Sequence, residues 1–275
     1  MDKFIATMND NGRTILKFLE KTLDGVPKSR IERLFRSKDV KINGKRISDK
    51  KTIVNEGDEI IVYGVRFAFV EREKVKPTFK VVFEDHNILV VEKPEGIVVH
   101  GETECLDNQV LSYLNFVKKD SFIPSHIGRI DKGTSGIMLY GKNYQAVRML
   151  NDATDHFDKY YIAISTLEED KELKVKIFHD EENQKEAISE KFGKECHTIF
   201  KVLGNSKVQA KIITGRKHQI RASLEFLGHP IKGDWKYDGT KAGRVYLHSH
   251  KLVLNGLEGE LAYLNGKVLT SKVPF

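Results

Sequence analysis

Cysteine, proline and long apolar runs are all scarce in this sequence of 275 residues. Its two cysteines, Cys105 and Cys196, form no Cys-x-x-Cys pair, which argues against a disulfide framework and a cysteine-based zinc site. We therefore expect a reducing, cytoplasmic setting. Six prolines and no biased tract argue against extensive disorder. The longest apolar runs, such as residues 88–91, are too short to cross a bilayer, and residues 1–11 lack a signal-peptide core, so no membrane partner is expected.

What the sequence does have is an uneven distribution of charge. The chain carries 46 Lys and Arg against 39 Asp and Glu, a net charge of +7. Residues 1–76 hold 18 of these cations against 12 acids, so nearly the whole excess lies in the first quarter of the chain. A basic segment beside a neutral body suggests that the segment binds a polyanion while the body does something else. A soluble protein with a lopsided surface would show the same pattern.

The first 70 residues predict a small α/β unit. Residues 13–23 have apolar side chains at helical spacing, and Ser29 with Glu32 has the spacing of a capping box at the start of a second helix. Asn43-Gly44 is the dipeptide most favourable for a two-residue hairpin turn. A last strand is expected over residues 59–63. The second helix and the hairpin carry the cationic side chains Arg30, Arg33, Arg36, Lys41, Lys45 and Arg46.

This segment resembles the αL-motif RNA-binding domain, which is named after a small-subunit ribosomal protein. The resemblance rests on Arg30-Ile31-Glu32-Arg33-Leu34, Val40-Lys41-Ile42-Asn43-Gly44-Lys45 and Glu56-Gly57-Asp58-Glu59-Ile60. It implies that residues 1–70 bind RNA through the six cations above, by contacts to phosphates that do not read base identity. A basic surface without a partner is the alternative.

Residues 71–80 are charged, contain Pro77 and lack periodicity, so we expect a linker there. The body, residues 81–275, has helical patterns over residues 143–157 and 217–227, the second ending at Gly228. Strands are expected over residues 80–83, 88–91, 160–165, 173–178, 197–202, 208–213, 245–254 and 261–264. Because strands and helices do not alternate regularly, the predicted fold class is α+β, with a mixed, mainly antiparallel sheet preceded by the small α/β unit.

The densest polar cluster of the body is Gly-Arg-Ile-Asp-Lys-Gly-Thr-Ser-Gly at residues 128–136, which predicts a tight loop entering a strand. If its backbone is extended, Arg129 and Asp131 point to the same side. An Asp kept ionised by a nearby Arg is a candidate nucleophile or base. A surface turn with a salt bridge would have the same sequence.

A second cluster, Thr-Gly-Arg-Lys-His-Gln-Ile-Arg, occupies residues 214–221. It places several cations at the start of the predicted helix, where free backbone amides also favour an anion. Phosphate or carboxylate binding is therefore one interpretation of this cluster. A solvated, charged first turn is the other.

Taken together, these clusters resemble motifs of the RluA-type pseudouridine synthases. The matching segments are Glu92-Lys93-Pro94-x-Gly96, Arg129-Ile130-Asp131-x-x-Thr134-Ser135-Gly136, Lys159-Tyr160-Tyr161-Ile162-Ala163, and residues 214–221 followed by Gly228-His229-Pro230-Ile231-x-Gly233-Asp234. They occur in the order of that family, in which a preceding αL-type domain is common. The resemblance implies the pseudouridine synthase fold and conversion of specific uridines in RNA to pseudouridine, a reaction that needs no cofactor.

The resemblance also implies roles for single residues. Asp131 matches the catalytic aspartate, which can add to the base, attack the anomeric carbon or take a sugar proton, and the sequence does not choose among these routes. Arg221 matches the arginine that pairs with this aspartate, and Tyr161 the tyrosine that packs on the target base and helps to remove its carbon 5 proton. Arg129 matches the arginine that fills the space left by a flipped nucleotide. The matched residues that contact RNA or shape the loop are Arg216, His218 and Gln219.

Three positions depart from the family pattern and bear on the RNA target. Gly128, Gly133 and Lys217 stand where the family commonly has His, Asp and Thr. Large-subunit ribosomal RNA is the expected partner because members with this domain order commonly act there, and transfer RNA stays open. The rival functions are a non-catalytic RNA-binding or ribosome-assembly factor with the same fold, and a glycosidic-bond hydrolase that would release uracil.

The remaining candidates carry no function. His248 and His250 would share one face of a strand, but no carboxylate or cysteine lies at a metal-binding spacing, so no metal is expected and a pair at the edge of the core is favoured. Trp235, the only tryptophan, is expected to be a packing residue. We expect the chain to be a monomer.

Overall fold

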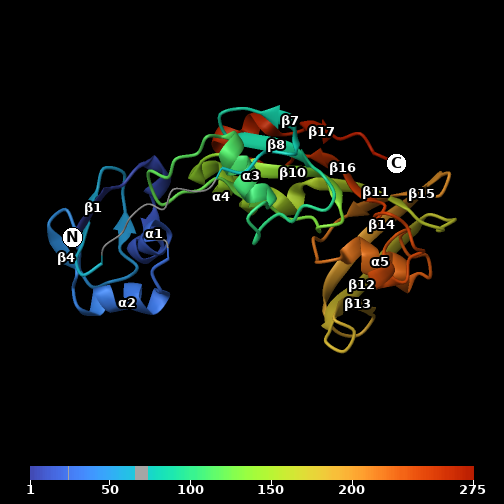
Figure 1. Cartoon of the computed structure of the whole chain (residues 1–275), viewed down its shortest axis with the longest axis horizontal. Coiled ribbons are helices and arrows are strands. Elements are labelled where there is room, and N and C mark those ends of the chain that lie inside the picture. Colours follow the sequence, from blue (N-terminus) through green and yellow to red (C-terminus); the bar gives the residue numbers. More distant parts are fainter. Residues whose placement is uncertain (24, 66–73) are drawn as a thin grey trace.

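The structure is a computed structural model that describes residues 1–23, 25–65 and 74–275. The N-terminal segment lies to one side of a larger body (Figure 1). Part of the predicted linker, residues 71–73, lies outside the described residues. Within the described ranges, no helix has the length and apolar content needed to cross a membrane.

The N-terminal segment forms its own sheet around its own apolar core. A four-stranded antiparallel sheet has the order β1 (Asp2–Ile5), β6 (Glu59–Val62), β3 (Val40–Ile42) and β4 (Lys45–Ile47), and β2 (Arg13–Thr14) pairs with β5 (Ile53–Val54). The helices are η1 (Met8–Asp10), α1 (Ile15–Thr22) and α2 (Lys28–Arg36). Phe18 of α1, Ile31 of α2 and Ile60 of β6 belong to one buried cluster, so both longer helices pack with the sheet.

Two local predictions in this segment had opposite outcomes. The hairpin turn at Asn43-Gly44 is confirmed, because both residues have the positive φ, 47° and 78°, that a two-residue turn between β3 and β4 favours. The capping box at Ser29 is wrong. Helix α2 begins earlier, at Lys28, with Pro27 at the N-cap position and no side chain capping it. Proline has no side-chain acceptor, so the first free amides of this helix receive no side-chain cap from Pro27.

The body is built on one eleven-stranded sheet. Its main path has the order β13-β12-β14-β15-β11-β16-β10-β8-β7, with β17 paired to β16 and β9 paired to β10. The strands are β7 (Lys80–Glu84), β8 (Ile88–Lys93), β9 (Ser125–Ile127), β10 (Ser135–Gly141), β11 (Asp158–Ile164), β12 (Lys171–Asp180), β13 (Lys185–Ser189), β14 (Lys194–Gly204), β15 (Lys207–Ile212), β16 (Leu247–Val253) and β17 (Val268–Thr270). Among the described residues, β10 with β16 is the one parallel ladder, which confirms the predicted mixed, mainly antiparallel sheet.

The predicted helices of the body are present, and one predicted strand is wrong. The helices are α3 (Leu106–Tyr113), α4 (Tyr144–Ala153), η2 (Thr154–His156), α5 (Gln219–Phe226), η3 (Trp235–Tyr237) and η4 (Gly259–Leu264). Gly228 follows the end of α5 with a φ of 78°, as predicted. Residues 261–264, predicted as a strand, belong to η4, where Leu261 and Leu264 both lie in the core. The patterns of α3, β9, β13 and β17 were not recognised.

Strand β10 is buried on both faces, which explains its continuous apolar sequence. Ile137 and Leu139 pack in a cluster with Leu150 of α4, whereas Met138 and Tyr140 pack in a second cluster that includes residues of α3. Successive side chains of a strand point to opposite faces, so the two helices cover opposite sides of the sheet. The loop that precedes β10 is therefore anchored in the best-packed part of the body.

The N-terminal segment contacts the body through η1. Asp10 is fully buried, and its carboxylate accepts hydrogen bonds from the backbone amide of Ser121, at 3.2 Å, and from the Ser121 hydroxyl. The guanidinium of Arg13 lies 3.9 Å from the centre of the Tyr144 ring at the start of α4. Past the undescribed residues, the amide of Thr78 donates to a side chain of α3 at 2.8 Å. Packing onto the body thus begins inside the segment predicted as a linker.

His248 of β16 lies in the core of the sheet and makes the stability of the fold depend on pH. It is fully buried, and its Nδ1 and Nε2 lie 2.8 Å and 2.9 Å from the hydroxyls of Ser135 and Ser271. Arg244 donates to the Ser135 hydroxyl at 2.8 Å, which leaves the Ser135 proton for Nδ1 of a neutral ring. Burial lowers the pKa of His248 to about 4.

We therefore expect stability to fall with pH in the window between the two pKa values of His248. From pH 6.5, the ordinary histidine value, down to about 4, the unfolded chain binds a proton that the folded protein excludes. The free energy of unfolding should decrease by about 1 kcal/mol per pH unit in that window. Urea titrations at successive pH values should show a smaller slope for His248→Asn, while His250→Asn keeps the wild-type slope. Equal slopes for all three proteins would contradict this assignment.

Candidate active site

A cleft of about 1110 Å³ opens on the body and is lined by residues of β10, β11, β16 and α5. It is lined by all the body residues that the resemblance gave a role, namely Asp131, Tyr161, Arg221, Arg129, Arg216, His218 and Gln219. They come from three separate segments, which are the loop before β10, strand β11, and α5 with the loop before it. The fold therefore brings together side chains that lie far apart in the sequence.

Asp131 lies in the loop between β9 and β10. The buried ammonium of Lys93 donates a hydrogen bond to the backbone of that loop. Lys93 is completely buried and donates to the carbonyl oxygens of Pro94 at 3.0 Å, Ile97 at 2.7 Å and Lys132 at 3.3 Å. Burial lowers the pKa of Lys93 to about 8, although the charge of Asp131 raises it, so most of the molecules keep the ammonium at neutral pH. The sequence showed this lysine within a motif but gave it no task.

Gly136 allows the strand after the loop to lie against β16. Its φ is 116°, and a Cβ atom added there would lie 2.2 Å from the carbonyl oxygen of Ser249. Gly136 pairs with Ser249 in the parallel ladder, and Tyr161 pairs with Ser249 from the other side. This close approach therefore requires glycine, and it places the Asp131 loop one strand away from β11, which carries Tyr161, with β16 between them.

Arg221 of α5 bridges two carboxylates. Its Nη1 donates to Oδ2 of Asp131 at 3.0 Å, and its Nε and Nη2 donate to the two oxygens of Asp234 at 2.6 Å and 2.8 Å. Burial lowers the pKa of Arg221, but the hydrogen bonds and charges of Asp234 and Asp131 outweigh it and raise the pKa above its ordinary value. The predicted pairing of Arg221 with Asp131 is confirmed. Asp234 is 1% exposed, and it closes a motif in the sequence to which no role was assigned.

Arg129 does not supply the positive charge beside Asp131. Its side chain is exposed at the cleft, and residues 129–131 belong to no strand. Within the part of the chain that the structure describes, no ion pair joins Arg129 to Asp131. The cation beside Asp131 is therefore Arg221 of a distant helix and not its neighbour in the sequence.

His218 turns the chain sharply into α5, so the helix begins later than predicted. It has a left-handed φ of 54°, and its Nδ1 lies 2.7 Å from the hydroxyl of Tyr237. That hydroxyl accepts from the amide of Glu186 at 3.1 Å, which leaves its proton for Nδ1. Burial lowers the pKa of His218, against the charge of Asp131. The neutral ring then carries its proton on Nε2, the atom 3.7 Å from Asp131.

Gln219 shapes the loop before α5. It is 3% exposed, and its Oε1 accepts from the amide of Arg216 and the hydroxyl of Thr214, both at 2.9 Å. Its Nε2 donates to the carbonyl oxygen of His197 at 3.0 Å and the hydroxyl of Thr198 at 2.9 Å. Of the two roles considered from the sequence, loop shaping fits and contact with RNA does not. The guanidinium of Arg216 is exposed, whereas its amide is no longer free for an anion.

Tyr161 contributes a protonated phenol to the cleft. Burial raises the pKa of Tyr161 to about 12, a hydrogen bond with Ser249 lowers it, and the charge of Asp131 raises it. The hydroxyl therefore keeps its proton at neutral pH. Because Tyr161 lines the same cleft as Asp131, its ring offers a flat surface next to the carboxylate.

The six cations predicted to bind RNA lie on α2 and the β3–β4 hairpin of the N-terminal segment. Arg30, Arg33 and Arg36 are all exposed on α2. On the hairpin, Lys45 and Arg46 are exposed and Lys41 is half-buried. Lys41 and Arg46 both lie near the ring of Tyr63, at 5.4 Å and 5.7 Å from its centre. The structure thus adds an aromatic ring that was not singled out, although its position after the last strand was visible in the sequence.

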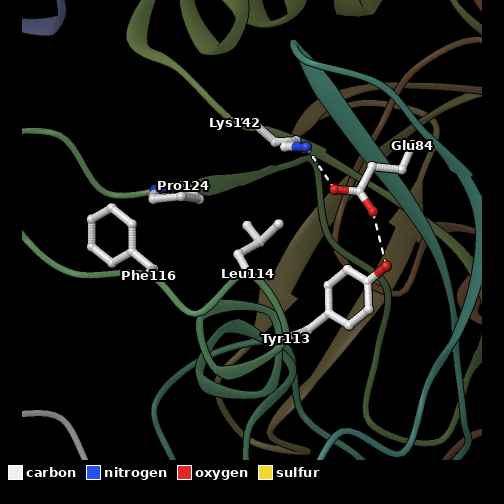
Figure 2. A pocket seen from close by; sticks show the side chains of 6 residues that line it. All are labelled: Glu84, Tyr113, Leu114, Phe116, Pro124 and Lys142. Carbon is white, nitrogen blue, oxygen red and sulfur yellow. Dashed lines mark hydrogen bonds and ion pairs between the residues drawn. The ribbon is translucent and has the colours of Figure 1, made fainter.

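A second hollow, of about 530 Å³, has its polar groups paired with one another (Figure 2). It is lined by Glu84, Tyr113, Leu114, Phe116, Pro124 and Lys142. The ammonium of Lys142 lies 2.6 Å from one oxygen of Glu84, and the hydroxyl of Tyr113 donates to the other oxygen at 2.9 Å. The lining residues therefore leave no unpaired charge for a ligand, in contrast to the larger cleft.

Comparison with known proteins gives concordant matches. A family model described as RNA pseudouridylate synthase matches residues 87–226. An uncharacterised RNA pseudouridine synthase of Mycoplasma capricolum is 36% identical over 98% of this chain and 97% of its own length. The ribosomal large subunit pseudouridine synthase C of Escherichia coli K12 is 31% identical over 91% and 88%. The solved structure of human RNA pseudouridylate synthase domain containing 1 has the same fold, with a TM-score of 0.56 and 21% identity over 74% of this chain and 93% of that one.

The bridge through Arg221 should make Asp234 more important for stability than Asp131. Asp234→Asn leaves a buried guanidinium with a neutral partner, so we expect the free energy of unfolding to fall by about 3 kcal/mol. Asp131→Asn should cost less than about 1 kcal/mol, because 28% of the Asp131 side chain is exposed and water can replace the lost charge. Urea unfolding of the two variants at neutral pH measures the difference. A larger loss for Asp131→Asn would contradict the assigned bridge.

Proposed function

Because the chain belongs to the RNA pseudouridylate synthase family and is an RNA pseudouridine synthase, we propose that it acts on specific uridines of large-subunit ribosomal RNA with Asp131 as its catalytic carboxylate. In this reaction the bond between N1 of uracil and C1′ of ribose breaks, the base turns, and C5 bonds to C1′. C5 loses its proton and N1 gains one. No electrons or groups leave the nucleotide, so the reaction requires no cofactor.

The placement of Asp131 is the observation that carries the proposal. Arg221 holds Oδ2, and among the described residues no hydrogen bond reaches Oδ1, so that oxygen is left for a substrate. A carboxylate held in a fixed position in a cleft can act as a nucleophile or a base. Addition to the base, attack on C1′ and removal of a sugar proton each use this one oxygen. The proposal covers all three routes.

We assign the other residues of the cleft to holding a flipped nucleotide. The reacting atoms of a stacked uridine are inaccessible, so the target must leave its helix. The cleft of about 1110 Å³ has room for a nucleotide and part of its neighbours. The ring of Tyr161 packs on the base, and the exposed guanidinium of Arg129 fills the vacated space in the RNA. Since the pKa of Tyr161 is raised to about 12, its phenol is protonated before substrate binds. In that state the phenol cannot accept the proton that leaves C5.

The N-terminal segment serves, in this proposal, to recruit RNA to the body. We divide the chain into an RNA-binding domain, residues 1–70, and a catalytic domain, residues 81–275. The exposed cations of α2 and the hairpin support this division, because they lie on a separate sheet with its own core. The name of the Escherichia coli relative, which refers to the ribosomal large subunit, supports the choice of RNA. The scarcity of cysteine supports a cytoplasmic setting, and both cysteines are free and buried.

Two other functions can be weighed against the same geometry. A non-catalytic RNA-binding factor would not need a carboxylate in an RNA-facing cleft, where it repels phosphates, nor a buried arginine to hold it in place. A glycosidic-bond hydrolase could use Asp131 in the same position, and it differs only in releasing free uracil. The product therefore separates the alternatives.

The decisive measurement is release of tritium from C5 of tritiated uridine in large-subunit ribosomal RNA. We expect wild type to release tritium and form pseudouridine without free uracil. Asp131→Asn keeps the shape of the side chain and loses its charge, so its rate should fall at least about a thousandfold while RNA affinity stays within about threefold.

Each other outcome of this assay assigns a different function. Free uracil would identify a hydrolase. Release from transfer RNA alone would change the substrate. Binding of both kinds of RNA without release of tritium would identify a non-catalytic binding factor. A normal rate for Asp131→Asn would show that Asp131 takes no part in the chemistry.

The recruiting role predicts a change in salt dependence. Replacing Arg30, Arg33 and Arg36 by glutamine in the full chain should make the slope of log K against log salt less steep by about 2–3, because each lost phosphate contact removes close to one unit. The control is Lys171→Gln with Lys174→Gln, two exposed lysines that are already paired with glutamates. A slope equal to that of wild type in the arginine variant would refute the role of α2, whereas turnover at saturating RNA should be the same in all three proteins.

A further inference from the structure

The only tryptophan of the chain is exposed. Trp235 lies on η3 with 82% of its surface exposed, so its prediction as a packing residue is wrong. Among the described residues, its indole contacts no other ring and its N–H donates no hydrogen bond. Tryptophan buries a large apolar area when it is covered, and it is enriched where proteins contact partners. The exposure of this side chain therefore indicates a surface that contacts a partner.

The loop that carries Trp235 is held rigidly at both ends. Gly233 has a φ of 82°, and a Cβ atom there would lie 1.6 Å from the carbonyl oxygen of Arg244. The amide of Gly233 donates to Thr240 at 2.8 Å, and the amide of Gly239 donates across the loop to Asp234 at 2.9 Å. The indole is thus presented by a backbone that is already ordered. A partner that covers it would not have to order the loop as well.

Trp235 also lies close to the catalytic carboxylate. It directly follows Asp234, whose two oxygens bind Arg221, and Arg221 binds Asp131. On the other side, Tyr237 is fully buried and bonds to His218 at 2.7 Å. The backbone of Trp235 is therefore separated from Asp131 by two ion pairs and one arginine side chain. Trp235 does not line the cleft itself, so nucleotides that neighbour the target are the part of the RNA within its reach.

The charges around Trp235 favour a polyanion. Lys232 and Lys241 are exposed and Lys236 is half-buried, all within the same loop. Lys236 is near enough to His218 to lower the pKa of that imidazole, after burial and the nearer charges. Of the two acids in this loop, Asp234 is buried against Arg221 and Asp238 is exposed, so the three lysines face one exposed acid. An exposed aromatic ring among lysines is the combination with which proteins bind single-stranded nucleic acid.

We propose that Trp235 stacks on an unpaired base that neighbours the target uridine in the RNA. This inference rests on the proposed function and adds to it a residue that binds substrate outside the reacting nucleotide. Stacking uses the flat face that all bases share, so Trp235 strengthens binding without selecting a sequence. It makes no contact with the reacting atoms and belongs to binding alone.

Because the chain has one tryptophan, its fluorescence reports this site directly. The full-length protein is titrated with a large-subunit ribosomal RNA transcript while filter retention measures the bound fraction in parallel. We expect the indole emission to be quenched along the same isotherm as retention. Retention without any change in emission would overturn the stacking and leave the proposed function intact. Absence of retention would overturn the proposed function and this inference with it.

Variants separate stacking from a structural role. Trp235→Leu should raise Kd for the transcript about tenfold, and Trp235→Phe, which keeps an aromatic ring, should stay within about threefold of wild type. The control is Tyr263→Leu, which removes another aromatic side chain that is 54% exposed, on η4 away from the cleft, and should bind as wild type does. The turnover number of Trp235→Leu at saturating RNA should be unchanged. Wild-type affinity in Trp235→Leu, or a loss of turnover at saturation, would overturn the proposal.

Salt dependence gives an independent test, because an indole neutralises no phosphate. Trp235→Leu should weaken binding equally at all salt concentrations, so the slope of log K against log salt stays that of wild type. Lys236→Gln, one position away, should make the slope less steep by about one if this lysine contacts a phosphate. A changed slope in Trp235→Leu would show that the substitution disturbs phosphate contacts, and stacking would no longer account for its effect.

Discussion

One guanidinium group fixes the geometry of the whole cleft. Arginine presents its N–H donors in a rigid plane, so a two-point contact with one carboxylate decides where the remaining donors point. In Arg221, Nε and Nη2 are taken by Asp234, and Nη1 is thereby aimed at Asp131. The candidate catalytic carboxylate is thus positioned through Arg221 by a buried aspartate from a distant part of the sequence.

A second buried cation, Lys93 at the end of β8, lies near the same carboxylate. Lys93 holds three carbonyl oxygens of the surrounding loops and stays mainly charged near Asp131. Removing a charge from water is costly, and both cations repay this cost with hydrogen bonds to carbonyls or carboxylates. The site therefore depends on a sheet that excludes water, and the burial of β10 on both faces supplies it. The electrostatics of the active site therefore depend on the packing of the core.

How far the sequence alone predicts this protein depends on whether a feature is local. The turn at Asn43-Gly44 and the end of α5 at Gly228 follow from the backbone preferences of single residues, and both are found as predicted. Leu261 and Leu264 are three residues apart, a spacing that suits the 3-10 helix found there. All four residues from 261 to 264 are apolar, so the sequence is also compatible with the predicted strand. A short apolar run does not separate the two by itself.

The site shows the same division more sharply. Asp131 has a cation two residues away in the sequence, and inspection of the loop alone favoured Arg129, whereas the fold supplies Arg221. The sequence predicts that Trp235 is a packing residue, and the structure shows it to be exposed. Asp234, the residue before it, is buried against an arginine that only the folded chain brings near. Resemblance to a family located the residues, and the structure was needed to say which of them touch.

If the exposed arginines of α2 recruit RNA as proposed, they also affect the release of RNA from the enzyme. Isomerisation of a base leaves every phosphate in place, so a surface that binds phosphates holds modified and unmodified RNA equally well. In the proposed division of roles, the N-terminal segment therefore does not distinguish product from substrate, and only the cleft meets the new N–H group of the rearranged base. Modified and unmodified RNA then compete for the cations of α2 on equal terms.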